Sequence, residues 1–263
     1  MELPPAWQRP DPLRGLDAVP WTELSDGRGS ARGIDDLLRH VVEEDPVLRD
    51  AAVIQLADRL LHEDAVSEAS AAAVPFLAEL GASYKVAPDA RDRVIFLLAA
   101  LGLAGCGFTE DGKRTWRRWN ALGRELPRLA PDWITQVRYA VAKAAPKVFE
   151  SLNNAEVACV VALATAVPEV VPKQTAHVLW AIADDPTHEL VEAATAAHHL
   201  VQGLESDHWA LLATAQEHPD LLRAYENEEY PPHQPGDVTM ALMGCRLAFL
   251  AAYGEEGQWS VMQ

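Results

Sequence analysis

Residues 184–189 could carry chemistry, because three carboxylates stand close together there in a D-D-x-x-x-E pattern. A helix that bears such carboxylates can hold Mg²⁺ against a diphosphate group. The second metal-binding motif that all-α enzymes of that kind need is not evident in the sequence. The pattern is also typical of a helix boundary, where Asp184 and Asp185 end one helix, Thr187 begins the next, and Glu189 interacts favourably with its dipole. We therefore expect a boundary here and no metal.

Three further side chains could meet on one helix face. His188, Glu192 and His199 are spaced i, i+4 and i+11, and His198 is adjacent. A zinc site needs three or four ligands that converge on the ion. The H-E-x-x-H pattern is absent, because Glu192 stands where its second histidine would be. We expect histidines at the solvent or at the edge of the core, with no metal and no other cofactor.

No arrangement for nucleophilic catalysis stands out. The sequence contains no G-x-S-x-G, P-loop or dinucleotide-binding pattern. Cys106, Cys159 and Cys245 are far apart, with no C-x-x-C pair and no histidine adjacent in sequence, which fits a reducing cytoplasm. An active site assembled from distant helices would leave no such pattern. The sequence favours a non-catalytic protein and leaves an enzyme open.

The strongest local feature is a basic and aromatic patch. Residues 113–128 hold six basic residues and one acidic residue, Glu125. Such a patch can grip phosphates and stack bases, dock an acidic partner, or keep its arginines in water or on carboxylates while its tryptophans pack inward. Because the chain is acidic, we favour the last interpretation and consider nucleic acid the weakest. The residues of the patch are Arg114, Trp116, Arg117, Arg118 and Trp119.

The net charge of −17 is unevenly distributed. Residues 1–150 hold 19 Lys and Arg against 23 Asp and Glu, whereas residues 151–263 hold 3 against 16. An acidic half disfavours binding to a phosphate backbone and favours either solubility alone or a basic partner. The contacts that we expect with such a partner are Glu192, Glu205, Asp207, Glu226, Glu228 and Glu229.

The elements that must position these residues are helices, because apolar residues recur at helical spacing and not in alternation. The first two helix pairs are spaced by roughly 40 residues, close to the period of HEAT and armadillo repeats. We expect helices at residues 33–43, 46–62, 66–80, 89–103, 114–129, 132–152, 155–167, 173–183, 187–204, 207–225 and 237–253.

These pairs predict an all-α fold, a right-handed α-solenoid of HEAT/armadillo-like helix pairs. Residues 1–15 are expected to be a flexible N-terminal segment and 16–263 a single solenoid, which could break at 105–113. The helix at 66–80 is nearly uncharged and contains Pro75, which should bend it. Such a helix is stable only where other helices cover more than one of its sides.

Residues 16–105 carry a resemblance to a known family. The matching features are Leu16-Asp17, Trp21, Leu24, Gly29-Ser30-Ala31, His62, Glu68-Ala69 and Val74-Pro75-Phe76-Leu77. This block resembles a bacterial HEAT-like repeat family common in actinobacteria, whose members are mostly uncharacterised or suspected interaction and immunity proteins. Arg28 stands where that family usually has tyrosine, and the segment after His62 departs from its usual Gln-Gly-Thr. The resemblance implies an α-helical repeat fold and no particular reaction.

The function that we expect is protein binding. No signal peptide and no apolar run of roughly 20 residues is visible, so we expect a soluble cytoplasmic protein without a membrane partner. The acidic second half suits a basic partner, and an immunity-type inhibitor of a toxin is the specific form that we favour. One alternative is an enzyme or accessory protein of specialised metabolism with a pocket in the solenoid groove. Another is nucleic-acid binding through residues 113–128.

Overall fold

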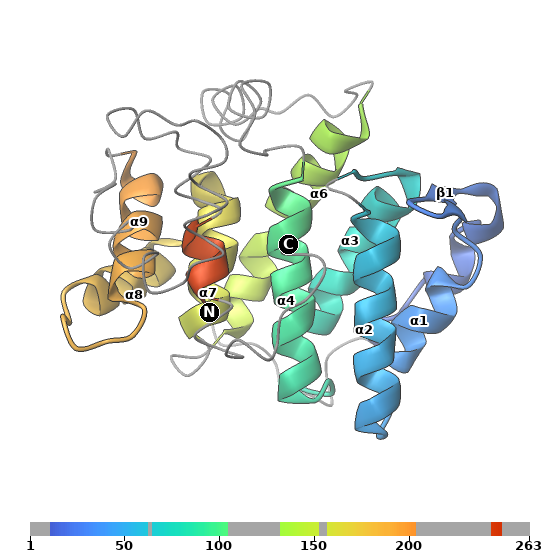
Figure 1. The fold of residues 1–263 in the computed structure, drawn as a ribbon, viewed down its shortest axis with the longest axis horizontal. Coiled ribbons are helices and arrows are strands. Elements are labelled where there is room, and N and C mark those ends of the chain that lie inside the picture. Colours follow the sequence, from blue (N-terminus) through green and yellow to red (C-terminus); the bar gives the residue numbers. More distant parts are fainter. Residues whose placement is uncertain (1–10, 63–64, 105–131, 153–156, 204–242, 249–263) are drawn as a thin grey trace. The chain divides into compact units, whose positions relative to one another are not determined.

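The computed structural model describes residues 11–62, 65–104, 132–152, 157–203 and 243–248 (Figure 1). The described chain is mostly helical, as predicted for an all-α protein. It forms two compact units. The described part of the first unit is residues 11–62, 65–104 and 132–152, and that of the second is residues 157–203 and 243–248. A single solenoid over residues 16–263 stays a prediction.

The first unit begins with short elements that precede its helices. Two 3₁₀ turns, η2 (Leu16–Ala18) and η3 (Trp21–Glu23), lead into a hairpin of β1 (Ser25–Asp26) and β2 (Gly29–Ser30). The strands are antiparallel, with Ser25 opposite Ser30. Leu16 and Trp21 are buried, and the indole N–H of Trp21 donates to the Leu16 carbonyl at 3.2 Å. These two side chains therefore anchor the segment in the first unit.

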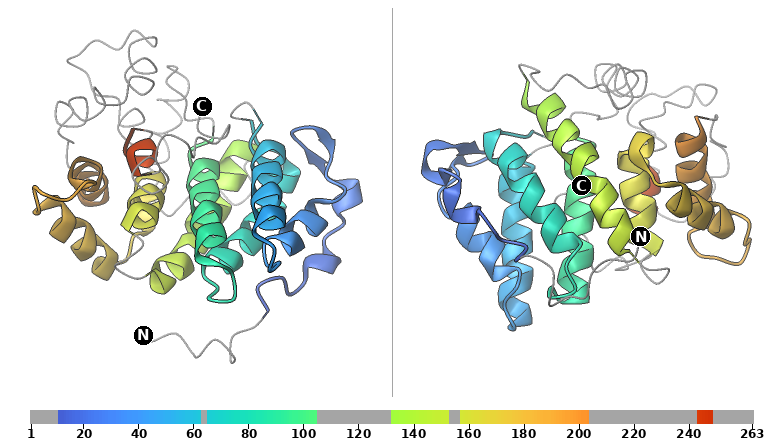
Figure 2. Two further views of the ribbon diagram at one scale, coloured as in Figure 1. Left: turned by 60° about the horizontal axis from the view of Figure 1, so that its bottom comes forward. Right: turned by 180° about the vertical axis from the view of Figure 1, so that it is seen from behind.

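Five helices follow in the described part of the first unit. They are α1 (Ile34–His40), α2 (Pro46–Leu60), α3 (Glu68–Gly81), α4 (Pro88–Gly102) and α6 (Trp133–Ser151). Helix α1 packs on α2, α3 packs on α4, α2 also contacts α4, and α6 contacts both α3 and α4 (Figure 2). Proline at the first position starts α2 as expected, and the preceding Asp45 accepts a hydrogen bond from the Val47 N–H at 2.9 Å.

Helix α3 is the centre of the first unit. It contacts α4, α6, α1 and β1, so neighbouring elements cover more than one of its sides, as its nearly uncharged sequence requires. Its small residues permit close packing, since a Cβ added at Gly81 would lie 3.0 Å from Ile95. Pro75 is exposed, so it interrupts the helix ladder on the solvent side, where water can hydrate the carbonyl that loses its donor.

Helix α2 exposes part of its apolar surface. Val47, Leu48, Ala51 and Ile54 are exposed, Val47 by 72%. The buried face is formed instead by Ala52, Val53, Leu56, Ala57 and Leu60. Apolar residues occur on two faces of this helix, and periodicity alone does not say which face the neighbours cover.

The second unit is built around an uncharged and largely apolar helix. Helix α7 (Val157–Ala166) is buried over nearly its whole length and packs on α9 (Val191–Gln202). A 3₁₀ turn, η5 (Pro168–Val170), leads into α8 (Lys173–Ala183), which also packs on α9. Residues 243–248 are helical, and Gly244 lies against α7, because a Cβ added there would lie 3.1 Å from the Thr165 methyl group.

Among the helices that the structure describes, none combines the length and the apolarity that a membrane crossing requires.

We expect Ser70→Ala to destabilise the first unit by about 1–2 kcal/mol. The Ser70 hydroxyl is buried, accepts from the Ser67 N–H at 3.0 Å and donates to the Leu60 carbonyl at 2.6 Å. Its removal leaves a carbonyl at the end of α2 and an amide at the start of α3 without this partner. Urea unfolding of the whole chain measures the loss. The exposed Ser30→Ala should leave the transition unchanged, and an equal effect of the two replacements would contradict the role of Ser70.

Candidate functional site

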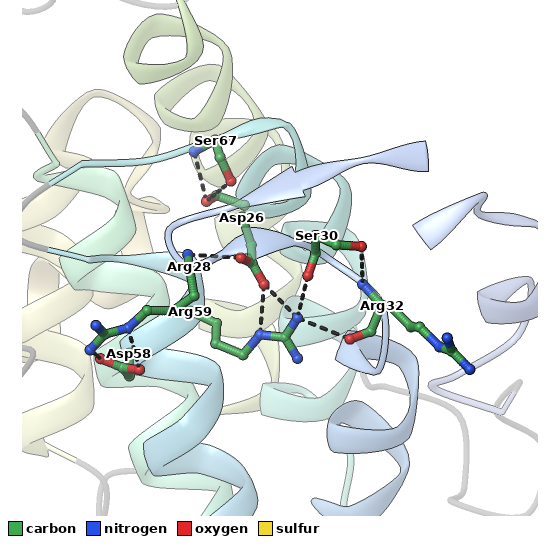
Figure 3. A network of polar contacts seen from close by, with 8 residues as sticks. Asp26, Arg28, Ser30, Arg32, Asp58, Arg59 and Ser67 are labelled. Atoms are coloured by element: carbon green, nitrogen blue, oxygen red, sulfur yellow. Dashed lines mark hydrogen bonds and ion pairs between the residues drawn. The ribbon is translucent and has the colours of Figure 1, made fainter. Parts of the chain in front are cut away.

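Two regions gather polar side chains of the kind that form sites, one in each unit. The first is a network that joins the β1–β2 hairpin to the C-terminal turn of α2 (Figure 3). The Asp26 side chain has no exposed surface, and Arg59 donates to its Oδ2 through Nε at 2.6 Å. Arg59 Nη2 also donates to the carbonyls of Ser30 and Arg32, at 2.8 and 3.0 Å. One guanidinium thus neutralises a buried carboxylate and fixes both ends of the hairpin turn.

A second ion pair lies at the outer edge of this network. Arg28 binds Asp58 through two parallel hydrogen bonds, Nε to Oδ2 at 3.0 Å and Nη2 to Oδ1 at 2.6 Å. The bond from Arg28 lowers the pKa of Asp58, and the positive charges around it act in the same direction. His62 lies near this pair, with its Nδ1 3.7 Å from Asp58 Oδ1. Arg28 is 55% exposed, so this pair is worth far less than the buried one.

The position of His62 is set by its backbone and by Gly27. His62 and Ala65 exchange hydrogen bonds between their backbone groups, and the Gly27 N–H donates to the Arg59 carbonyl at 2.8 Å. A Cβ at Gly27 would lie only 2.4 Å from the Cβ of His62, so only glycine allows this approach. The carboxylates of Asp26 and Asp58 both bind arginine inside the network. The arrangement therefore holds the hairpin against α2, and we assign it a structural role.

The second region is the junction of α8 and α9, which contains the D-D-x-x-x-E pattern of residues 184–189. Asp185 accepts hydrogen bonds from the amide and the hydroxyl of Thr187, at 3.0 and 2.6 Å. These bonds lower the pKa of Asp185, and the bond from the hydroxyl has the largest effect. His188 Nδ1 accepts from the Leu190 N–H at 3.1 Å. These are local turn contacts. No group of three His, Cys, Asp or Glu in the described residues is placed to hold a metal ion.

The junction corrects one prediction. We expected a helix from residue 187, which would place His188 on one face with Glu192 and His199. Helix α9 begins only at Val191, because the side chains of Asp185 and His188 bind backbone amides and form a turn first. His188 is therefore not on the helix that carries the other two residues. Within α9, the pKa of His198 is lowered mainly by the burial of its side chain and also by the charge of the neighbouring His199.

The acidic side chains of the two units differ in their surroundings. Several carboxylates of the first unit pair with cations, as in Arg39 with Asp17, Asp35 and Asp36, and Arg93 with Asp50. In the described part of the second unit, no Lys or Arg forms an ion pair with any of four carboxylates, and all but the half-buried Glu192 are exposed. They are Asp184, Asp185, Glu189 and Glu192. This group, which we call the α8–α9 acidic surface, includes one of the predicted contacts, Glu192.

Sequence reasoning missed an aromatic pair beside this surface. Trp180 is 48% exposed on α8, and its ring lies 5.4 Å from that of His177, with an angle of 21° between the planes. Asp184 follows Trp180 by one helical turn, and its N–H donates to the Trp180 carbonyl at 3.0 Å. The spacing of His177, Trp180 and Asp184 was the available signal, since i, i+3 and i+7 place side chains on one helix face.

The remaining predicted site residues lie outside the described part of the chain, so the structure does not place them. The acidic ones are Glu205, Asp207, Glu226, Glu228 and Glu229. The basic and aromatic ones are Arg114, Trp116, Arg117, Arg118 and Trp119.

Comparison of the chain with protein-family models, curated proteins and solved structures gave no match.

The buried ion pair predicts a large cost when one partner is removed. Arg59→Ala leaves the Asp26 charge buried, and we expect it to destabilise the first unit by about 3–5 kcal/mol in urea unfolding. Adding Asp26→Asn to that variant should recover part of the loss, because no buried charge remains. If the double variant is less stable than Arg59→Ala alone, the pair is not the source of the effect.

The exposed pair predicts a change in titration and little change in stability. Arg28→Ala should raise the pKa of Asp58 toward its usual value of about 3.9, because the hydrogen bonds that stabilise the carboxylate are lost. NMR titration of the Asp58 carboxyl carbon measures the shift, and Arg32→Ala serves as the control. The depressed pKa contributes stability above the unfolded value that is lost as the pH falls through the folded one. An unchanged Asp58 titration would exclude Arg28 as the cause.

Proposed function

We propose that this protein binds a basic protein partner through the acidic second half of its chain. The observation that carries the proposal is the contrast in charge pairing between the two units. Charges that are paired within a protein are largely satisfied, whereas the carboxylates of Asp184, Glu189 and Glu192 have no cationic partner among the described residues. Unpaired charge of one sign speeds and orients association with a partner of the opposite sign.

The architecture that we propose for this role is a right-handed α-solenoid of HEAT-like helix pairs. The pairing of α1 with α2 and of α3 with α4, and the contact of successive pairs with each other and with α6, support it for the first unit. The resemblance of residues 16–105 to bacterial HEAT-like repeat proteins points in the same direction. Solenoids expose extended surfaces that suit protein binding.

The specific form that we propose is an immunity-type inhibitor of a toxin. A toxin domain that acts on nucleic acid carries a basic surface, because it must bind the phosphate backbone. An acidic surface can cover such a basic surface and so block its substrate. A gene for a basic toxin domain beside the gene for this chain would support this form.

The proposal is tested by reversing charge on the α8–α9 acidic surface. We expect the wild-type chain to capture a basic protein at low salt, and the double variant Asp184→Lys with Glu189→Lys to bind that protein at least about tenfold more weakly. The matched control is Glu43→Lys with Glu44→Lys, which makes the same change of net charge at exposed positions of the first unit. Binding should be measured with the purified partner by calorimetry over a series of salt concentrations.

Two results would contradict the proposal. One is the absence of any basic partner in low-salt capture from the cells that make this protein. The other is an equal loss of affinity in the two double variants, which would show that net charge matters and the location of the surface does not.

A further inference from the structure

We infer that the exposed face of α8 is the place where an arginine side chain of the basic partner binds, stacked on Trp180 and paired with Asp184. The inference rests on the proposed function and deepens it, because it names the contact residues and the chemistry that they recognise. The partner is a protein segment rich in arginine.

The first support is the exposure of an aromatic ring where the fold does not need it. Trp180 is 48% exposed, whereas the α8 residues that face the core, Thr175, Leu179 and Ile182, are all buried. Tryptophan is among the residues that dominate binding energy at protein interfaces. His177 stacks on the indole at 5.4 Å and so restricts its motion, which lowers the entropy that binding must remove.

The second support is the placement of a carboxylate next to that ring. The hydrogen bond from the Asp184 N–H to the Trp180 carbonyl, at 3.0 Å, shows that the helical turn continues to Asp184. Side chains one turn apart on a helix lie about 5–6 Å from each other at their Cβ atoms. A cation over the indole can therefore reach the carboxylate. Ala181, exposed between them in sequence, adds no bulk that would block a partner.

The third support is the distribution of charge along α8. Lys173 stands in its first turn, and Asp184 and Asp185 stand at its end. A basic partner is repelled at the beginning of the helix and attracted at its end, beside Trp180. The same order of charges disfavours an acidic or phosphate-bearing ligand at the aromatic pair.

Arginine fits this face better than lysine does. Its guanidinium is planar, so it can lie flat on an indole while its edge donates hydrogen bonds to a carboxylate. The lysine ammonium is a compact and strongly hydrated charge, which gains less from an aromatic face. The geometry thus predicts a preference for arginine over lysine at equal peptide charge.

The experiment uses the whole chain and two labelled peptides of equal length, one of alternating arginine and serine and one of alternating lysine and serine. Fluorescence anisotropy at low salt should show tighter binding of the arginine peptide. We expect Trp180→Ala to weaken that peptide about threefold to tenfold and to abolish the preference, and Trp180→Phe to keep part of it. Trp133→Ala, which removes a tryptophan that is 37% exposed in the first unit, should change nothing. Asp184→Asn should weaken both peptides.

The outcomes separate this inference from the proposed function. If both peptides bind equally well and Trp180→Ala has no effect, but Asp184→Lys with Glu189→Lys abolishes binding, the aromatic contact is wrong and the basic partner stands. If the wild-type chain binds neither peptide, the aromatic contact is wrong, and the low-salt capture of a basic protein decides the proposed function separately. Circular dichroism of each variant shows whether the fold is kept, and Trp180→Phe still tests the inference if Trp180→Ala unfolds.

Discussion

The buried charge of Asp26 is the constraint on which the start of the first unit depends. A carboxylate without exposed surface must be neutralised inside the protein, and Arg59 does so from the last turn of α2. The same guanidinium holds the carbonyls of Ser30 and Arg32, so a single side chain determines where the hairpin lies. The hairpin in turn brings Trp21 against Phe76 of α3, with ring centroids 6.3 Å apart. The ion pair of Asp26 and Arg59 therefore positions the aromatic contact of Trp21 with Phe76.

The ion pairing of the first unit contrasts with the scarcity of basic residues in the second half of the chain. In the first unit, arginines and a lysine from several elements meet carboxylates of other elements, as in Lys147 with Glu79 and Arg49 with Asp89. Residues 151–263 have only three basic residues, so most of their carboxylates have no cation of their own half to bind. Self-repulsion among such charges costs stability. A basic partner would relieve that repulsion, which links the composition of this half to the function that we propose.

Sequence reasoning found the elements better than the contacts. The bounds of α8 were predicted correctly, because Pro172 precedes it and Asp184 and Asp185 follow it. The start of α9 was placed too early, since a turn built by side-chain hydrogen bonds leaves no periodic signal. The pairing of Asp26 with Arg59 joins residues that are 33 positions apart, and nothing local indicates it. Which apolar face of α2 is buried could not be predicted, because burial depends on neighbours that the helix sequence does not specify.

The histidines of the second half show why composition alone did not locate a site. His188, Glu192 and His199 share a spacing that could serve a metal, but His188 binds the backbone of a turn and belongs to no such group. His177 was not singled out, although its spacing places it on one helix face with Trp180, and it stacks on that exposed ring. The pair of His177 and Trp180 can serve as a binding surface because the opposite face of α8 packs on α9. That packing fixes the helix, so its exposed face is presented in one position. The core packing of α8 on α9 is thus what turns three ordinary residues, His177, Trp180 and Asp184, into a candidate binding face.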